Sequence, residues 1–373
     1  MHRKSGQLLD MKSFSRYASR LNLFQNKTVF YKRKTSILPR VTIQHVARRA
    51  NVSPATVPRV LNHKATVATH LRERVLAAAD ELGYMPDRAA RRLRAGHSDV
   101  LGLIVGDIQN PHFVSVIQGV QDAAHQRNMN IILCDSDESS ERIARNAAVL
   151  RAESVAGLIV VPTPSGDYDT LKSLQDNNIP LVLLDRPVNG LNADTVMSDN
   201  VAGACTGVQH LIKLGRRRIA GIFPDIQTGR QRREGFIKAH IDAGLPAPDE
   251  SLMLVGSYRA QGSYEVVRAL FAGNPPDAIF TATNLVTLGV IRAMRELGIR
   301  SPQDIALVGF DDMPWADELF IPYTALAQQT YRMGATAVER LMDRIDNPRR
   351  DTQVVRLPVE LIIRDSCGAK LTR

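Results

Sequence analysis

Apolar side chains follow two different rhythms on either side of residue 99. Between residues 42 and 82 they recur at helical spacing, as in Ile43, Val46 and Ala47. After Val100 they gather in short continuous runs rich in Val, Ile and Leu, separated by amphipathic stretches. The first rhythm predicts a small all-helical domain. The second predicts strands that are buried on both faces of a parallel sheet.

The helical segment predicts two short helices joined by a tight turn, and a third helix over about 70–82. Asn51 marks the turn, because Asn tolerates the left-handed conformation better than most residues. Ser53 can cap the second helix with Pro54 at its first position, and Gly83 ends the third. The side chains expected in the shared core are Ile43, Val46, Ala47, Ala50, Val57, Val60, Leu61, Leu71, Val75, Leu76 and Leu82.

The remaining chain predicts two doubly wound α/β units. The first has strands at 100–105, 130–134, 156–161 and 180–184, with helices near 112–127, 139–151 and 167–177. The second has strands at 218–223, 252–256, 278–282 and 305–310, with helices near 200–214, 230–243, 260–272 and 285–297. Two such units side by side leave a cleft at the carboxyl ends of both sets of strands, where these folds bind ligands.

The second short helix is suited to a DNA major groove, because its inner face is apolar and its outer face is short and polar. Arg59 lies on the free face, where it can give two hydrogen bonds to guanine O6 and N7, worth about 1–3 kcal/mol of discrimination. Ala55 is small enough to admit the helix deeply and to touch a thymine methyl group. We predict that Pro54, Ala55 and Arg59 read bases.

Charge agrees with a polyanionic partner at one end of the chain. Residues 1–40 hold ten Lys and Arg against one Asp, and residues 41–98 hold ten against four acidic residues. These segments carry +9 and +6 of a total net charge of +10, which leaves −5 for the other residues. A basic amino-terminal quarter on a mildly acidic body is typical of a nucleic-acid-binding protein.

Several motifs together resemble the lactose-repressor (LacI-type) family of bacterial transcription regulators. They are T-I-x-x-V-A at 42–47, S-P-A-T-V-x-R-V-L-N at 53–62, R-E-R-V at 72–75, L-G-Y-x-P at 82–86 and A-x-R-L-R-A-G at 90–96. With the motifs of the cleft, the resemblance covers residues 41–368. It implies a body with the periplasmic-binding-protein-like arrangement, in which the chain crosses between two subdomains near 197, 327 and 356.

The resemblance also implies roles for the polar residues of the helical head. Those expected to contact the DNA backbone are Thr42, Ser53, Thr56, Asn62 and Tyr84. Segment 87–95 carries four arginines and is short for an isolated helix in water. The family implies a hinge helix here that folds on the operator, with Leu93 wedged into the minor groove and Arg91 and Arg94 beside it. A flexible basic linker is the alternative for this segment.

Two positions depart from the family pattern. Position 58 is Pro where the family usually has Ser, and Pro58 falls in the fifth position of the expected helix. A proline inside a helix costs about 3 kcal/mol, so we expect a weaker DNA-binding head. Position 68 is Ala where a Ser usually caps the third helix, and Thr69 could substitute.

Polar and aromatic residues follow the predicted strands of the body, and the resemblance places a set of them around a ligand. The expected effector-binding residues are His112, Phe113, Asp185, Thr228, Arg232, Tyr258, Asn284, Asp311 and Gln328. Carboxylates and an arginine suit a sugar or sugar acid better than a purine. Some have structural alternatives: Phe113 and Tyr258 as core residues, His112 as a surface residue, and Arg232 as part of a solvated helix face.

Other sequence features limit the remaining classes of function. No run of eighteen apolar residues exists, and the three cysteines lack C-x-x-C spacing. The turn after 100–105 reads GDIQNP rather than G-x-G-x-x-G, and no common hydrolase or zinc-protease motif occurs. We therefore expect no enzyme, metal or cofactor. A free-standing sugar-transport component would lack the helical head and would need an export signal.

These observations predict a bacterial, cytoplasmic, nucleoid-associated repressor that binds a pseudo-palindromic operator as a homodimer, has no membrane partner and is controlled by a small carbohydrate-like effector. The alternative is a sugar-sensing protein whose DNA binding is impaired by Pro58. Residues 1–40 lack an apolar core for a secretory signal, and a mis-assigned start codon or a disordered basic arm fits them better than a transit peptide. The expected divisions are a 1–40 extension, a 41–86 helix-turn-helix domain, an 87–98 hinge, a 99–368 effector-binding domain and a 369–373 tail.

Overall fold

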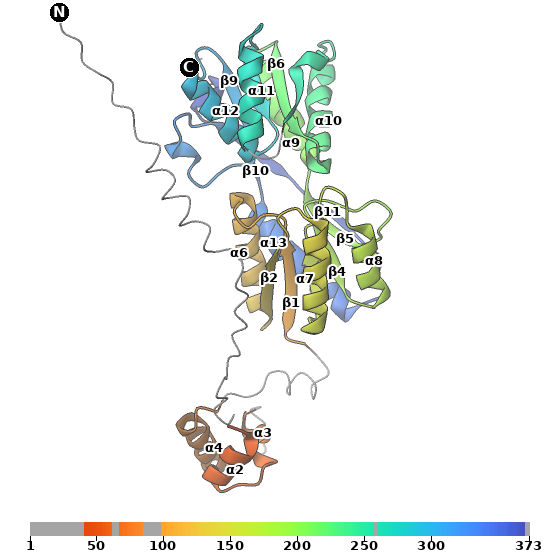
Figure 1. The fold of residues 1–373 in the computed structure, drawn as a ribbon, viewed down its shortest axis with the longest axis vertical. Coiled ribbons are helices and arrows are strands. Elements are labelled where there is room, and N and C mark those ends of the chain that lie inside the picture. Colours follow the sequence, from red (N-terminus) through yellow and green to blue (C-terminus); the bar gives the residue numbers. More distant parts are fainter. Residues whose placement is uncertain (1–40, 62–66, 85–97, 257–259, 370–373) are drawn as a thin grey trace, which may run out of the picture. The chain divides into compact units, whose positions relative to one another are not determined.

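The computed structural model describes residues 41–61, 67–84, 98–256 and 260–369 of the chain (Figure 1). The contacts divide it into two units, Met1–Arg88 and Ala89–Arg373, which we call the head and the body. No helix in these described ranges is both long and apolar enough to cross a membrane.

The head is a bundle of three helices, α2 (Ile43–Ala50), α3 (Thr56–Leu61) and α4 (Thr69–Glu81). Asn51 adopts the left-handed conformation predicted for the turn, with φ 49°. Gly83, with φ +59°, ends α4 as predicted, and the next residue donates from its backbone N–H to the carbonyl of Ala79 at 2.8 Å. The buried core consists of Val46, Ala47, Ala50, Val57, Val60, Val75, Ala78 and Ala79.

Helix α3 begins later than predicted, and this changes the interpretation of Pro58. The helix starts at Thr56 rather than Pro54, and the Ser53 hydroxyl lies 2.9 Å from the Thr56 hydroxyl. Pro58 is therefore the third helical residue, not the fifth. The first four N–H groups of a helix have no partner within it, so the proline removes no helical hydrogen bond. The penalty expected for an interior proline does not apply.

The prediction that Leu76 belongs to the core was wrong, because its side chain is 44% exposed. The inward stripe of α4 runs through Val75, Ala78 and Ala79, with Leu82 partly packed against the core. This is the i, i+3, i+4, i+7 spacing of one helical face, and Leu76 lies one residue outside it.

The body contains two six-stranded sheets, each enclosed by helices (Figure 1). The first has the order β11-β5-β4-β3-β1-β2 and comprises β1 (Val100–Val105), β2 (Asn130–Asp135), β3 (Gly157–Val160), β4 (Leu181–Leu184), β5 (Asp194–Ser198) and β11 (Val354–Leu357). The second has the order β12-β10-β9-β8-β6-β7 and comprises β6 (Ile219–Pro224), β7 (Met253–Gly256), β8 (Ala278–Thr281), β9 (Ala306–Phe310), β10 (Thr324–Gln328) and β12 (Val359–Ile362). All recorded pairs are parallel except β10 with β12.

Helices cover both faces of each sheet, as the continuous apolar strands predict. We call the first sheet with its helices the N-subdomain, which contains α6 (Pro111–His125), α7 (Ser140–Ala152), α8 (Tyr168–Asp176) and α13 (Thr330–Asp346). The C-subdomain contains α9 (Asn200–Lys213), α10 (Gln227–Asp242), α11 (Ala260–Phe271) and α12 (Asn284–Glu296). Short 3-10 helices lie at Glu250–Leu252, Ala316–Glu318 and Asp365–Cys367. Each sheet has a hydrophobic cluster on either face.

Three connections join the subdomains. The chain leaves the first sheet after β5, returns after β10 through α13, and passes back at Pro358 between β11 and β12. Helix α13 packs on α6, and at this contact a Cβ on Gly119 or Gly334 would collide with a backbone carbonyl of the other helix. Only glycine fits where two helix backbones come so close.

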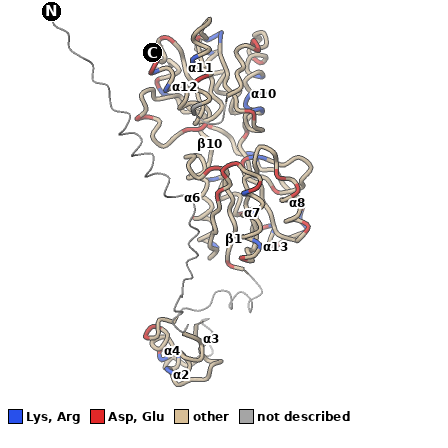
Figure 2. The backbone as a smooth tube through the Cα atoms, viewed as in Figure 1, with Lys and Arg blue, Asp and Glu red and all other residues tan. Residues whose placement is uncertain are grey.

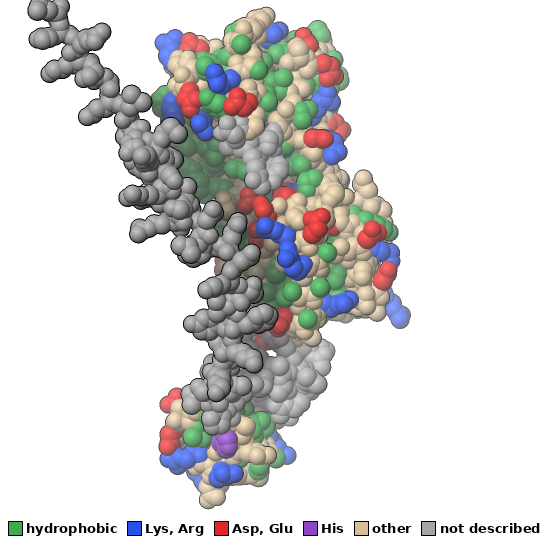
Figure 3. Space-filling model, in the orientation of Figure 1, with side chains coloured by type: hydrophobic (Ala, Val, Ile, Leu, Met, Phe, Trp, Pro, Cys, Tyr) green, Lys and Arg blue, Asp and Glu red, His purple; other side chains and the backbone are tan. Residues whose placement is uncertain are grey.

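Charge is distributed unevenly in the body. Figure 2 shows acidic positions gathered along the boundary between the two subdomains. Figure 3 shows one face of the body, on which the described Lys and Arg side chains lie among Asp and Glu side chains and form no separate basic patch. In this view, acidic residues are therefore concentrated at the boundary between the subdomains.

Candidate functional site

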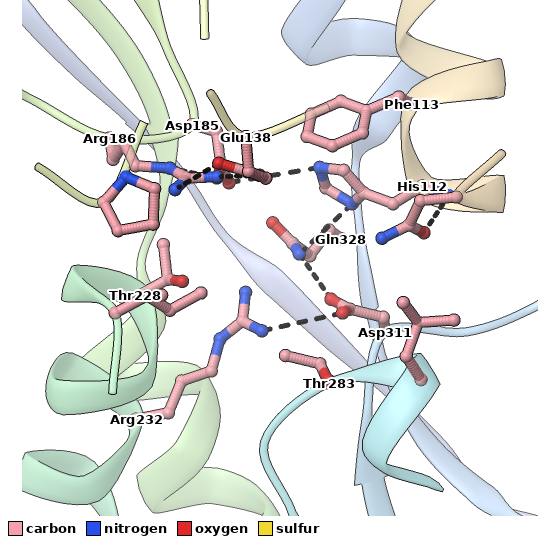
Figure 4. Close-up of a pocket in the computed structure, with 14 residues that line it drawn as sticks. His112, Phe113, Glu138, Asp185, Arg186, Thr228, Arg232, Thr283, Asp311 and Gln328 are labelled. Carbon is pink, nitrogen blue, oxygen red and sulfur yellow. Dashed lines mark hydrogen bonds and ion pairs between the residues drawn. The ribbon is translucent and has the colours of Figure 1, made fainter. Parts of the chain in front are cut away.

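A pocket lies between the subdomains, where the carboxyl ends of strands from both sheets meet (Figure 4). Seven of the predicted effector-binding residues line it: His112, Phe113, Asp185, Thr228, Arg232, Asp311 and Gln328. The other residues in its wall are Asn110, Glu138, Pro164, Arg186, Ile226, Thr283 and Leu285. The topology thus brings together side chains separated by more than two hundred positions in the sequence.

Three carboxylates at the pocket lie on residues with left-handed backbones. Glu138 follows β2 with φ 55°, Asp185 follows β4 with φ 69°, and Asp311 follows β9 with φ 71°. This conformation is unfavourable for residues other than glycine, and such residues concentrate at functional sites. From these positions, each of the three acidic side chains points toward the pocket (Figure 4).

Arg186 connects two of these carboxylates in the N-subdomain. Its guanidinium donates to both oxygens of Glu138 at 2.9 and 3.2 Å, and to Asp185 at 3.3 Å. The Arg186 side chain is only 4% exposed. Burial raises the pKa of Glu138, and the charge of Arg186 opposes that rise. The result is a desolvated ion-pair cluster on one wall.

Arg232 forms the corresponding cluster in the C-subdomain. Its guanidinium donates to Asn200 Oδ1 at 2.8 Å and to the carbonyl of Ala282 at 2.6 Å, and lies 3.6 Å from Asp311 Oδ2. It also stacks 3.7 Å above the ring of Phe310. Burial lowers the pKa of Arg232, and Asp311 counteracts this. Because Arg232 is 2% exposed, the alternative of a solvated helix face is wrong.

Gln328 and His112 join the two clusters. Gln328 Nε2 donates to Asp311 Oδ1 at 2.5 Å and lies 3.4 Å from His112 Nδ1. An Nδ1 that accepts this bond leaves the proton of a neutral imidazole on Nε2. That Nε2 atom is 4.0 Å from Asp185 and is buried without a hydrogen-bond partner, as is Gln328 Oε1. These two atoms give the pocket an unpartnered donor and an unpartnered acceptor for a ligand.

The environments of His112 and Phe113 settle two alternatives. His112 is 9% exposed, so its assignment to the surface was wrong. Phe113 is 4% exposed and belongs to the core of the N-subdomain while also lining the pocket. Its ring meets that of His112 edge to face, with centroids 4.9 Å apart. The core alternative and the pocket prediction therefore both describe Phe113.

Asn284 does not line the pocket, contrary to the prediction. It is fully buried, and its Nδ2 donates across the subdomain boundary to Asn110 Oδ1 at 2.8 Å. Its backbone N–H donates to Asp311 Oδ2 at 3.3 Å. The Asn284 side chain was expected to point at a ligand because Asn284 follows β8. Instead, the side-chain amide of Asn110 is near enough to accept its hydrogen bond directly. Tyr258 lies outside the described residues.

Sequence reasoning missed several residues of the wall. Asn110 and Arg186 adjoin predicted residues, so proximity along the chain was a usable signal. Glu138 gave no comparable signal, because it is one of several acidic residues in the segment DSDESSER. Its selection depends on the backbone turn after β2, which no local pattern predicts.

In the head, each of the predicted base-reading residues is exposed. Pro54, Ala55 and Arg59 are all exposed, and Arg59 lies in α3.

Among the predicted backbone-contacting residues, Thr42 and Ser53 are exposed and Thr56 is half-buried. Tyr84 is also half-buried and packs against the core. Asn62 and the hinge residues Arg91, Leu93 and Arg94 lie outside the described residues.

Two family models match separate parts of the chain. Residues 42–87 match the model for bacterial regulatory proteins of the lacI family. Residues 208–367 match the periplasmic binding protein-like domain.

Full-length relatives show the same combination. The chain is 34% identical over 330 residues to the ribose operon repressor of Halalkalibacterium halodurans, covering 87% of this chain and 96% of that protein. It is 32% identical, with the same coverage, to the HTH-type transcriptional repressor PurR of Serratia proteamaculans.

Solved structures agree with this assignment. A Lac repressor dimer bound to operator and the anti-inducer ONPF matches with a TM-score of 0.80 and 27% identity, over 88% of this chain and 99% of that one. The complex of the transcriptional regulator CelR with cellobiose matches with a TM-score of 0.66 and 30% identity, over 88% and 100%. The chain therefore belongs to the lacI family of bacterial regulatory proteins, DNA-binding transcriptional regulators that combine a helix-turn-helix head with a periplasmic-binding-protein-like body.

Proposed function

We propose that this protein is a repressor that binds a pseudo-palindromic operator as a homodimer, and that a small carbohydrate in the pocket controls its affinity for that operator. The carrying observation is the pair of unpartnered buried atoms, His112 Nε2 and Gln328 Oε1, in a pocket that the ring of Phe113 also lines. A sugar hydroxyl can accept from the first and donate to the second, while the apolar face of a sugar ring can lie against an aromatic side chain.

The remaining wall supports the same class of ligand. Asp185 and Asp311 can accept hydrogen bonds from hydroxyl groups, Arg186 and Arg232 can donate to them, and Thr228 can do either. The names of similar proteins agree, since one relative is a ribose operon repressor and one similar structure contains bound ribose. Tyr258 remains a proposed pocket residue, and Asn284 acts through Asn110 instead.

For the DNA complex, we propose that α3 enters the major groove and that Arg59 reads a guanine, with Pro54 and Ala55 close to the bases. Thr42, Ser53, Thr56, Asn62 and Tyr84 contact the backbone. Leu93, Arg91 and Arg94 act at the minor groove. The alternative of impaired DNA binding depended on an interior Pro58 and loses that basis, because Pro58 lies in the first turn of α3.

The control mechanism we propose is a shift between open and closed forms of the cleft. A ligand that prefers one form increases the population of that form. The size of the increase is limited by the difference between the ligand's affinities for the open and closed forms. Movement of one subdomain relative to the other then alters the segment that precedes β1 and leads to the head. The protein acts in the bacterial cytoplasm at the nucleoid, and the proposal involves no catalysis, metal or organic cofactor.

The first test is selection of random duplex DNA by the purified full chain at two salt concentrations. The proposal predicts an enriched palindrome with a guanine in each half-site, and Arg59→Ala should relax preference at that position. D-ribose, cellobiose and related sugars are then added to the complex, and one of them should change operator affinity at least tenfold. Salt-sensitive retention of DNA without any enriched sequence would contradict the proposal.

A further inference from the structure

The charge balance of the pocket limits which carbohydrates it can hold. Among the described residues that line it, Glu138, Asp185 and Asp311 carry carboxylates, whereas Arg186 and Arg232 carry guanidiniums. These five side chains have a formal net charge of −1. Such a wall repels an anion unless a guanidinium is free to pair with it.

Both guanidiniums are already engaged by the protein. Arg186 is 4% exposed and makes two hydrogen bonds to Glu138 and one to Asp185. The Arg232 side chain is also buried, donates to Asn200 and a backbone carbonyl, and lies 3.6 Å from Asp311. A phosphate or carboxylate that paired with Arg186 would have to displace its two buried carboxylates, leaving them desolvated without a partner. One that paired with Arg232 would compete with Asp311.

Helix N-termini are the other anion-binding groups in this region, because their first N–H groups bind phosphate. Two of them already have side-chain acceptors. Asn110 Oδ1 accepts from the backbone of His112 at 3.0 Å at the start of α6. At the start of α12, Asp311 and Thr283 accept from the backbone N–H groups of residues 284 and 286. The first turn of α10 has no side-chain cap, so its N–H groups can donate to a ligand oxygen, whether neutral or anionic.

We infer that the pocket selects uncharged polyhydroxy compounds, meaning free sugars, over sugar phosphates and sugar acids, and that Glu138 is the residue that sets this selectivity. The inference rests on the proposed carbohydrate effector. Hydroxyl groups donate as well as accept, so they satisfy carboxylates that an anionic oxygen would only repel. Glu138 holds Arg186 in a two-bond clamp and supplies the third negative charge.

The test compares neutral and anionic members of matched sugar pairs. Binding of D-ribose, D-ribose 5-phosphate, D-glucose, D-glucuronate and cellobiose to the full chain is measured by calorimetry at constant ionic strength. For any pair that binds, the neutral sugar should bind at least tenfold more tightly than its anionic partner. Glu138→Gln should shift that ratio at least tenfold toward the anion, since it removes one charge and releases Arg186 from its clamp.

Two further variants separate charge from damage to the fold. Glu138→Asp keeps the negative charge on a shorter side chain. It should lower the affinity for every sugar while preserving the preference for the neutral sugar. Glu141→Gln removes an exposed charge three residues away, where the side chain accepts from Ser139 Oγ at 2.6 Å. This control should leave both affinities unchanged. If Glu138→Asp and Glu138→Gln give the same ratio of neutral-sugar to anionic-sugar affinity, the charge of Glu138 does not set the selectivity.

The possible failures are distinguishable. Binding of an anionic sugar as tightly as its neutral partner would overturn the selectivity and leave the carbohydrate effector intact. If none of the five compounds gives a heat of binding, that result would count against the carbohydrate effector itself. It would therefore count against both the proposed effector and its selectivity. Operator selection, which uses no sugar, tests the DNA-binding part separately.

Discussion

One position in the head, Ala68, lacks the side chain that usually caps the N-terminus of a helix. Ala68 is the N-cap of α4 and provides no side-chain hydrogen bond, with φ −57° and ψ 140°. A serine there can keep this extended backbone and accept from the first turn. The sequence indicated the missing cap, and the substitute suggested at Thr69 is the first residue of the helix itself.

We predict that Ala68→Ser stabilises the head by about 1 kcal/mol, the usual value of a serine N-cap relative to alanine. Urea denaturation followed by circular dichroism measures this through the earlier, head-specific transition. The matched control is Ala77→Ser at an exposed interior position of α4, which should destabilise by a few tenths of a kcal/mol because serine is a poorer helix former. Equal effects at both positions would contradict the capping argument.

Neighbouring arginines on α10 provide the second residue-scale prediction. Arg232 is buried with Asn200 and Asp311, whereas Arg233 is 39% exposed and pairs with Glu250 at the surface. Arg232→Met should cost about 3–5 kcal/mol, because it leaves Asp311 buried without its cation. Arg233→Met should cost less than about 1 kcal/mol. Denaturant unfolding of the body measures both, and similar losses would show that Asp311 does not depend on Arg232.

At the scale of elements, the strands and helices of the body were largely predictable. Continuous Val-, Ile- and Leu-rich runs place eight strands within one or two residues of their observed ends, because a strand buried on both faces admits few polar residues. The four short strands that complete the sheets, such as β5 and β11, mix polar and apolar residues and were not predicted. Helix α3 started late because Pro54 and Ala55 form a turn first.

The pocket was predictable where a residue directly follows such a strand, as for Asp185 and Asp311. It was not predictable for Glu138, whose position depends on a left-handed turn in an irregular loop. Nor could the sequence show that Asn284 meets Asn110, since the contact joins elements of different subdomains. Long-range pairings of this kind arise from topology rather than from local pattern.

The Asn110–Asn284 bond connects the N-cap of α6 with the first residue of α12 across the cleft. Asn110 Oδ1 accepts both from Asn284 Nδ2 at 2.8 Å and from the backbone of His112 at 3.0 Å. We predict that Asn284→Ala increases the radius of gyration of the ligand-free protein in solution scattering, because a bond between the two sides of the cleft is lost. Asn110→Ser should do the same while still capping α6.

Asn110→Asp is the matched control, since a carboxylate keeps both acceptor functions. It should retain the compact form seen with the unmodified protein. Combining Asn110→Ser with Asn284→Ala should add nothing to either single change, because both remove the same bond. An unchanged radius of gyration in Asn284→Ala would show that the bond does not hold the cleft closed.

At the scale of the whole molecule, the two binding activities must be coupled if one controls the other. Thermodynamic linkage requires that an effector which changes operator affinity by a given factor has its own affinity changed by the same factor when operator is bound. We predict equal factors for the selected operator and for the sugar identified by calorimetry. The measurement is sugar titration of the protein with and without a saturating operator duplex, beside operator titration with and without saturating sugar.

A scrambled duplex of equal length and charge is the control, because nonspecific DNA binding depends mainly on phosphate contacts and salt. It should leave sugar affinity unchanged. Equal sugar affinities with and without operator would mean that the ligand has no differential interaction with the DNA-bound form. The pocket would then be a binding site without control over the head, even if both sites were individually intact.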